Sequence, residues 1–326
     1  MTTQPTRHPD RGRVLLLLCA VYFLVILDAA IVRIALPSIQ REAGLTPASE
    51  TWVASAYMLT FGTMLLLGGR AADVLGRKRM LLVGLGLFVL ASLACGLAAS
   101  AGTLIAARAC QGLGAAAMTP AALSILMRTF PEGVERNKAI GAWGATGGVG
   151  ATMAWLIGGP LIDGPGWQWV FWIIVPAGLA IAAAAVPILQ ESRDAEARRD
   201  FDIAGSLTVT AALVALVYAI VDAPDAGWGS AKTVSMFALS LVLFTAFAAI
   251  ERGAATPLVP QRITRSRSLV AANVGLACTA ASIYGMAFIV ALYGQEVLGY
   301  SALKFGLAGI VLPVGAAWAP ASVRGW

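Results

Sequence analysis

The sequence predicts an all-α polytopic membrane protein, and three observations support that prediction. The 326 residues are 59% hydrophobic and 12% charged, with a mean hydropathy of +0.79, outside the range of soluble globular domains. Apolar runs recur that are long enough to cross a hydrocarbon core about 30 Å thick. The cations gather in short stretches between these runs, whereas nucleic-acid binding needs basic residues on one solvated face.

Ten apolar windows are candidate membrane spans, with the N-terminus inside. The windows are 14–36, 51–69, 80–99, 103–127, 139–162, 168–189, 203–221, 233–250, 269–293 and 303–320. The first window is too long for a signal-peptide core, so we interpret it as a retained helix. Two polar stretches interrupt the series, one after the sixth span and one after the eighth. They predict three units, 1–190, 191–260 and 261–326.

The cysteine and histidine residues show no pattern typical of a metal or cofactor site. The four cysteines all fall inside apolar windows and lack the spacing of a metal site or a disulfide framework. The single histidine, His8, lies in the polar N-terminal tail. We therefore expect no metal, no cofactor and no intramembrane histidine relay.

A polar turn separates the second and third windows and carries four cations and one carboxylate. Such a turn cannot lie in lipid, and its basic residues, Arg77 and Lys78 among them, suit a cytoplasmic face. Gly69 opens it, and Gly76 suits a backbone position with positive φ. Asp73 is predicted to lie at the N-terminal end of the following helix, where the helix dipole favours a negative charge.

Charged residues also occur inside two of the predicted spans. Asp28 and Arg33 lie in the first window, and Arg108 lies in the fourth, three residues before Gln111. A charge at the bilayer midplane costs about 2.5–3.5 kcal/mol on insertion scales, so these side chains must face protein or a wet cavity. A carboxylate beside a cation can take up or release a proton, which predicts a coupling site. The alternative is an ion pair that only holds helices together.

The fifth window is rich in glycine, a composition that permits close helix packing and bending. Gly150, Gly158 and Gly159 belong to this small-residue surface, whereas Trp155 places a large ring among them. Aromatic residues then open the sixth window, as an interfacial belt requires.

The polar turn resembles the signature loop between helices 2 and 3 of the major facilitator superfamily. The matching pattern is Gly69-x-x-x-Asp73-x-x-Gly76-Arg77-Lys78. The family usually has Leu and Arg at the positions of Ala71 and Val74.

Further runs resemble the fourteen-helix drug:proton antiporter branch of that superfamily. The first window is similar to its helix 1, with Ala30 and Arg33 where the branch usually has Thr and Asn. Arg108-x-x-Gln111-Gly112 is similar to its helix 4 motif. In the glycine-rich fifth window, Ala154 and Trp155 replace the central Gly-Pro of the antiporter motif.

The resemblance implies a six-helix N-terminal bundle, two inserted helices and only the first two helices of a second bundle, as in a truncated chain. It implies proton-coupled efflux of hydrophobic or cationic small molecules across the cell (cytoplasmic) membrane, with protons, substrate and lipid as partners and no enzymatic chemistry. The implied roles are proton coupling by Asp28 and Arg108, a substrate cavity with Arg33, Gln111 and Trp155, and gating by the polar turn.

Two alternatives remain open. The altered Gly-Pro motif is compatible with an uptake carrier, and a chain without most of its second bundle is compatible with a protein that inserts but does not transport. The sequence identifies no protein partner and no particular substrate.

The distribution of cations predicts the topology. The N-terminal tail and the loops after even-numbered spans hold 17 of the 23 lysines and arginines, and the opposite loops hold three. The loops expected in the cytoplasm are those around Lys78, Lys138, Arg198 and Arg265, and those expected outside are those around Arg41, Asp163 and Lys232. A cysteine placed at position 198, in a background without native cysteines, should resist an impermeant thiol reagent added to intact cells. Labelling of this cysteine from outside would refute the topology.

Overall fold

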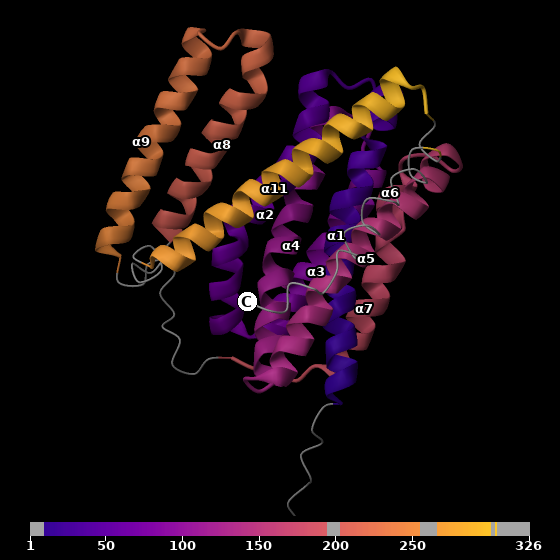
Figure 1. The fold of residues 1–326 in the computed structure, drawn as a ribbon, viewed down its shortest axis with the longest axis vertical. Coiled ribbons are helices and arrows are strands. Elements are labelled where there is room, and N and C mark those ends of the chain that lie inside the picture. The colour runs from indigo at the N-terminus through magenta and orange to yellow at the C-terminus, as the bar shows by residue number, and fades with distance from the viewer. Residues whose placement is uncertain (1–9, 194–202, 255–265, 301–303, 305–326) are drawn as a thin grey trace, which may run out of the picture.

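The computed structural model describes residues 10–193, 203–254, 266–300 and 304. In those residues all regular structure is helical, which confirms the predicted all-α class (Figure 1). Within the described residues, eight segments are long and apolar enough to span a membrane, and they match the first eight predicted windows. The ninth window corresponds to helix α11, Arg267–Leu292, followed by a π-helical turn, η1, Tyr293–Val297. The tenth window lies outside the described residues, apart from Lys304.

Most helices extend beyond the apolar windows that predicted them. Their bounds are α1 Arg11–Ala43, α2 Pro47–Leu75, α3 Arg77–Gly96, α4 Ala101–Thr129, α5 Val134–Asp163, α6 Trp169–Trp172, α7 Ile174–Ile188, α8 Ile203–Ala226 and α9 Ala231–Gly253. Hydroxyl side chains of Thr46, Ser100 and Ser230 cap the N-termini of α2, α4 and α9, because each accepts a hydrogen bond from a backbone N–H in the first turn. These three helices therefore begin at local capping signals.

The sixth predicted span is interrupted. It consists of the short helix α6 and the longer α7, with a turn at Ile173 between them. Pro176 has no N–H, so the carbonyl of Trp172 cannot receive the usual helical hydrogen bond from that position. The two pieces together still form one candidate span, Trp169–Ile188.

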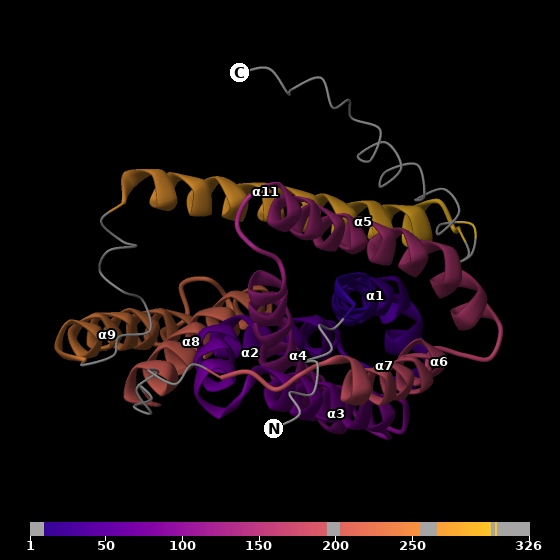
Figure 2. The ribbon, with the colours of Figure 1, turned by 90° about the horizontal axis from the view of Figure 1, so that it is seen from below.

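Helix α4 lies between α2 and α3 and packs tightly on both (Figures 1 and 2). A Cβ atom added to Gly112 would collide with the Thr60 side chain and the Tyr57 carbonyl on α2. On the other side, Gly84 of α3 and Gly114 of α4 approach each other with backbone atoms alone. The Thr60 hydroxyl donates to the carbonyl of Ala109 at 2.8 Å. Small residues thus let the three helices approach at backbone distance.

The predicted glycine surface of α5 lies against α1. A Cβ on Gly150 would meet the Phe23 carbonyl at 3.2 Å, and one on Gly158 would meet the Ile31 side chain at 3.3 Å. Both glycines, and Gly159 beside them, are buried. The close approach of α1 and α5 therefore depends on the absence of side chains at these positions.

Helices α8 and α9 form a hairpin beside α2, on the side of the molecule away from α7 (Figures 1 and 2). The rings of Trp52 on α2 and Tyr218 on α8 lie 6.2 Å apart, and Lys232 pairs with Asp222 at 2.9 Å across the hairpin. The predicted boundary at residue 190 falls directly after α7. The division into three functional units stays a prediction.

We expect Gly112→Ala to lower the free energy of unfolding by about 1–3 kcal/mol, the typical cost of overpacking. The new methyl group must push α2 away from α4, since its neighbours include backbone atoms that cannot turn aside. Thermal unfolding of the purified protein in detergent measures the change. Gly86→Ala is the control, because no atom lies within 4 Å of its added Cβ. Equal melting temperatures for the two variants would contradict this packing.

Candidate functional site

A buried polar cluster joins α1 to α4. Nη1 of Arg108 donates to Oδ2 of Asp28 at 2.8 Å, and Nε2 of Gln111 donates to Oδ1 of the same carboxylate at 2.8 Å. Gln111 also accepts a hydrogen bond from Arg108. Asp28 and Gln111 are fully buried, and Arg108 is 1% exposed. The sequence predicted that Asp28 and Arg108 face protein or a wet cavity, and the structure brings these two together with Gln111.

The surroundings of the cluster satisfy and orient its polar groups. Nε of Arg108 donates to the carbonyl of Val53 on α2 at 3.1 Å, and Nε2 of Gln111 also donates to Oγ of Ser92 on α3 at 2.8 Å. The guanidinium lies over the ring of Tyr57, 4.3 Å from its centroid, and near the ring of Phe171 on α6. Residues of five helices therefore form or surround this one ion pair. A change in its charge would alter contacts with all five helices.

The local sequence explains why these groups meet. Arg108 and Gln111 are three residues apart, which places both on one face of α4. Gly112 lets that face approach α2, so the arginine can reach the backbone of α2 while bonding Asp28. An ionised carboxylate at this depth requires compensating donors, and Arg108 and Gln111 provide one for each oxygen. Protonation of Asp28 would remove the charge that Arg108 neutralises.

A crevice of about 550 Å³ adjoins the cluster. Its walls come from α1 and α2, and Arg108 contributes to it from α4. Arg33 and Glu50 are its other charged lining residues, among apolar side chains such as Val32 and Met58. The crevice includes the first turn of α2, which the topology prediction places on the outer side. A mostly apolar cavity with a few polar groups is the usual form of a small-molecule site.

The predicted cavity residues do not all line this crevice. Arg33 lines it, and its Nε donates to the carbonyl of Ala29 at 3.0 Å. Gln111 instead belongs to the buried cluster, because both oxygens of Asp28 need a donor. Trp155 lies on α5 and packs against the hydrophobic core, outside the residues that line the crevice. Their roles in binding stay predictions.

The polar turn between α2 and α3 is shorter than predicted, because α2 continues to Leu75 and α3 begins at Arg77. Gly76 alone separates them, at φ +114°, which confirms the predicted positive φ. Asp73 lies in the last turn of α2 and not at the start of α3, which corrects the prediction. Arg77 explains that position, since its Nη2 donates to Asp73 at 2.6 Å while its Nε donates to Ser124 on α4.

Glu191, which the sequence reasoning did not single out, caps the start of α3. Its two carboxylate oxygens accept hydrogen bonds from the backbone N–H groups of Lys78 and Arg79, each at 3.1 Å. The backbone N–H of Arg77 donates to the carbonyl of Ser192 at 2.9 Å. A negative charge at a helix N-terminus satisfies unpaired donors and favours the helix dipole. The only sequence signal was that Glu191 is the first acidic residue after the sixth span, on the side predicted for the basic turn.

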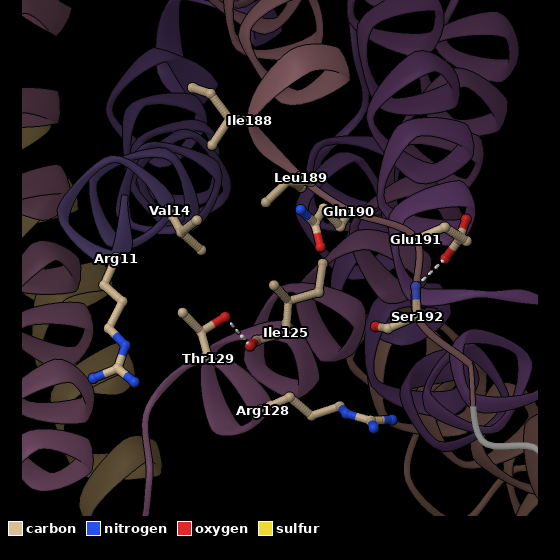
Figure 3. A pocket seen from close by; sticks show the side chains of 10 residues that line it. All are labelled: Arg11, Val14, Ile125, Arg128, Thr129, Ile188, Leu189, Gln190, Glu191 and Ser192. Carbon is tan, nitrogen blue, oxygen red and sulfur yellow. Dashed lines mark hydrogen bonds between the residues drawn. The ribbon is translucent and has the colours of Figure 1, made fainter. Parts of the chain in front are cut away.

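A second cavity, of about 700 Å³, lies at the same end of the bundle (Figure 3). The start of α1, the end of α4 and the segment after α7 surround it, with Arg11, Arg128 and Glu191 as its charged lining residues. Arg11 pairs with Glu135 of α5 at 2.9 Å. This pairing and the Glu191 cap place the N-terminus of α1, the α2–α3 turn, the start of α5 and the end of α7 at one end, as the predicted topology requires.

Among the described residues, no group of three or more histidine, cysteine or acidic side chains is arranged to hold a metal ion.

Comparison with known proteins gives consistent matches. Residues 18–325 match the family model described as Major Facilitator Superfamily. The chain is 38% identical over 309 residues to the puromycin resistance protein pur8 of Streptomyces alboniger, covering 95% of this chain and 61% of that protein. It is 37% identical over 295 residues to the cephamycin export protein CmcT of Amycolatopsis lactamdurans, covering 90% of this chain and 61% of that protein. The chain thus spans about three fifths of the length of these curated relatives.

Solved structures show the same fold. The crystal structure of the peptide transporter POT in complex with sulfate superposes with a TM-score of 0.64 at 19% identity, covering 98% of this chain and 70% of that one. A POT family transporter in complex with a thioalcohol-conjugated peptide gives a TM-score of 0.65 at 16% identity, covering 95% of this chain and 70% of that chain.

We expect Glu191→Ala to destabilise the junction between the α2–α3 turn and the end of α7 by about 1 kcal/mol, the usual cost of losing a helix cap. Trypsin should then cleave after Arg193 several-fold faster, because the segment loses the Glu191 contacts with the backbone N–H groups of Lys78 and Arg79. Timed proteolysis of the protein in detergent, followed by mass spectrometry, measures the rate.

The matched control is Glu132→Ala. Glu132 is an exposed acid at the same end of the bundle and forms a surface ion pair with Arg136. An unchanged cleavage rate for Glu191→Ala, equal to that of the control, would show that Glu191 does not anchor the segment.

Proposed function

The chain belongs to the Major Facilitator Superfamily, and from that premise we propose that it is a proton-coupled efflux transporter for hydrophobic small molecules, cationic ones included. A member of this superfamily that spans the membrane several times is a transporter and not an enzyme. The observation on which the proposal depends is the buried pair of Asp28 and Arg108, whose arginine also lines the crevice.

The direction of transport is inferred from the relatives. Besides the puromycin and cephamycin proteins, a tetracenomycin C resistance and export protein of Streptomyces glaucescens is 36% identical over 300 residues. Their names describe resistance to and export of structurally different compounds, which supports outward transport at the cytoplasmic membrane. Membership of the fourteen-helix antiporter branch is part of the proposal. Because the relatives extend well beyond the region that this chain matches, the activity of a whole protein is proposed by analogy.

In the proposed mechanism, the proton and the substrate act on the same arginine. With Asp28 ionised, Arg108 is held in the cluster by a carboxylate and two neutral oxygens, those of Gln111 and Val53. A proton on Asp28 removes the ionic part of that attraction, so the guanidinium is less firmly held and can respond to a molecule in the crevice. Release of the proton restores the pair. Alternating access between two helical bundles would convert this exchange into transport.

The polar turn is proposed to act as a gate at the cytoplasmic end. Asp73, Arg77 and Glu191 tie α2, α3, α4 and the end of α7 together there. These contacts would have to rearrange or move as one body when the bundle tilts.

An uptake carrier is the second candidate. Trp155 supports it, because this ring stands in α5 where the antiporter branch usually has the central Gly-Pro. Flux in everted vesicles distinguishes the two directions.

We expect Asp28→Asn to abolish the proton-gradient-dependent part of dye efflux in cells that express the protein. The amide has a similar size and can hydrogen-bond, but it cannot carry a proton. Efflux of a fluorescent dye, measured with and without an uncoupler at equal expression, gives the gradient-dependent part.

Asp225→Asn is the matched control, because Asp225 is exposed near the end of α8. If Asp28→Asn keeps a normal dependence on the proton gradient, the carboxylate has only a structural role.

A further inference from the structure

The primary amide of Gln111 connects the buried ion pair to α3. Its oxygen, Oε1, accepts a hydrogen bond from Arg108 on α4 and a longer one, at 3.9 Å, from the thiol of Cys95 on α3. Its nitrogen, Nε2, donates to Oδ1 of Asp28 and to Oγ of Ser92, each at 2.8 Å. Both hydrogens of the amide nitrogen and both lone pairs of the amide oxygen therefore have partners.

The partners of this amide differ in whether they can exchange donor and acceptor roles. The Ser92 hydroxyl accepts from Gln111 and donates to the carbonyl of Phe88, one turn earlier in α3, at 2.7 Å. A hydroxyl can donate or accept, and a thiol can do both weakly, so Ser92 and Cys95 can serve either end of the amide. Arg108 cannot, because a guanidinium has donors and no acceptor.

A proton on Asp28 does not fit the present arrangement. Its two oxygens receive hydrogen bonds from Arg108 and Gln111, and no group among the described residues accepts one from them. A protonated carboxyl carries an O–H group, which needs an acceptor because Asp28 is fully buried. Rotation of the Gln111 amide by about 180° supplies that acceptor, since the amide oxygen then faces Asp28 and Ser92.

We propose that Gln111 is the positioning residue that converts protonation of Asp28 into release of Arg108, an inference that rests on the proposed proton-coupled function. When Asp28 takes up a proton, the amide reverses, so its oxygen accepts from Asp28 and Ser92 while its nitrogen turns toward Cys95 and Arg108. The amide nitrogen and the guanidinium are both donors. Arg108 therefore loses its place beside Gln111 and moves toward the crevice, which it already lines. Loss of the proton restores the first arrangement.

The ionisable groups around the cluster come from three neighbouring helices. Arg108 lies on α4, Cys95 on α3 and Tyr57 on α2, with the Tyr57 ring against the guanidinium. Helix α6 contributes the ring of Phe171. Helix α7 carries no charged residue, and the charges of α5 lie near its two ends. Asp28 is thus the carboxyl whose protonation adds a donor beside the amide.

Solid-state NMR of the purified chain in lipid bilayers tests the reversal. With ¹⁵N at Nε2 of glutamine and ¹³C at Cβ of serine and cysteine, dipolar couplings report how far Nε2 lies from Ser92 and from Cys95. Acidification should weaken the coupling to Ser92 and strengthen the coupling to Cys95. The ¹³C signal of the Asp28 carboxyl, in the same sample, shows whether that group is protonated. Gln111→Met gives the blank spectrum, and Gln40→Met, elsewhere on α1, should leave both couplings unchanged.

A Ser92 variant assigns the reversal to this chain of hydrogen bonds. In the present orientation, Ser92→Ala leaves one Nε2 hydrogen of Gln111 without an acceptor. In the reversed orientation it removes only one of two donors to a carbonyl oxygen, which costs less than a buried unpaired N–H. At a given pH the ratio of reversed to present orientation should therefore rise about tenfold. Ser240→Ala is the control, because Ser240 is also buried but bonds Ala212 on α8.

Couplings that stay the same while Asp28 becomes protonated would overturn the proposal, and so would a carboxyl of Asp28 that stays ionised on acidification. An orientation ratio in Ser92→Ala equal to that of the Ser240→Ala control would also overturn it. The measurement involves no flux, so its failure is distinct from a failure of proton-driven efflux. Efflux that depends on Asp28, with an amide that keeps its orientation, would retain the proposed function and remove only this role of Gln111.

Discussion

The structure depends on keeping two opposite charges together inside an apolar bundle. Asp28 and Arg108 come from helices far apart in the sequence, and each would carry a large desolvation penalty without the other. Their contact fixes the rotation of α1 and α4, because only one face of each helix carries the charge. Gln111 then occupies the remaining oxygen of Asp28, and Val53 the Nε of Arg108, so the pair also sets the position of α2.

The close helix packing is the second condition for this cluster. Arg108 reaches the backbone of α2 only because Gly112, one turn later, brings the two helices to backbone contact. Helix α1 packs more extensively on α5 than on α2, where Gly150 and Gly158 permit close approach. The looser α1–α2 boundary is the place where the crevice opens. The positions of small residues therefore determine both where helices pack closely, at α2–α4 and α1–α5, and where the crevice opens, between α1 and α2.

The sequence predicted the features that depend on local composition. Hydrophobic windows located the spans, a charge at depth placed Arg108 in the interior, and glycine between charged residues indicated the positive φ of Gly76. It could not predict contacts between distant segments. Asp73 appeared to suit the start of α3, but its partner Arg77 holds it on the preceding helix, and the cap comes from Glu191, more than a hundred residues later. No period or motif within one segment encodes such a contact.

A double-mutant cycle on the buried pair tests this account most directly. The free energy of unfolding would be measured for the unmodified chain, Asp28→Asn, Arg108→Gln and the double variant, by denaturation in mixed micelles. Each single change leaves the other charge buried without its partner, so the account predicts that each costs about 3–5 kcal/mol. The double variant should then cost at least about 1.5 kcal/mol less than the sum of the two. Costs that add to within about 0.5 kcal/mol would show that the two charges do not depend on each other, and would contradict the account.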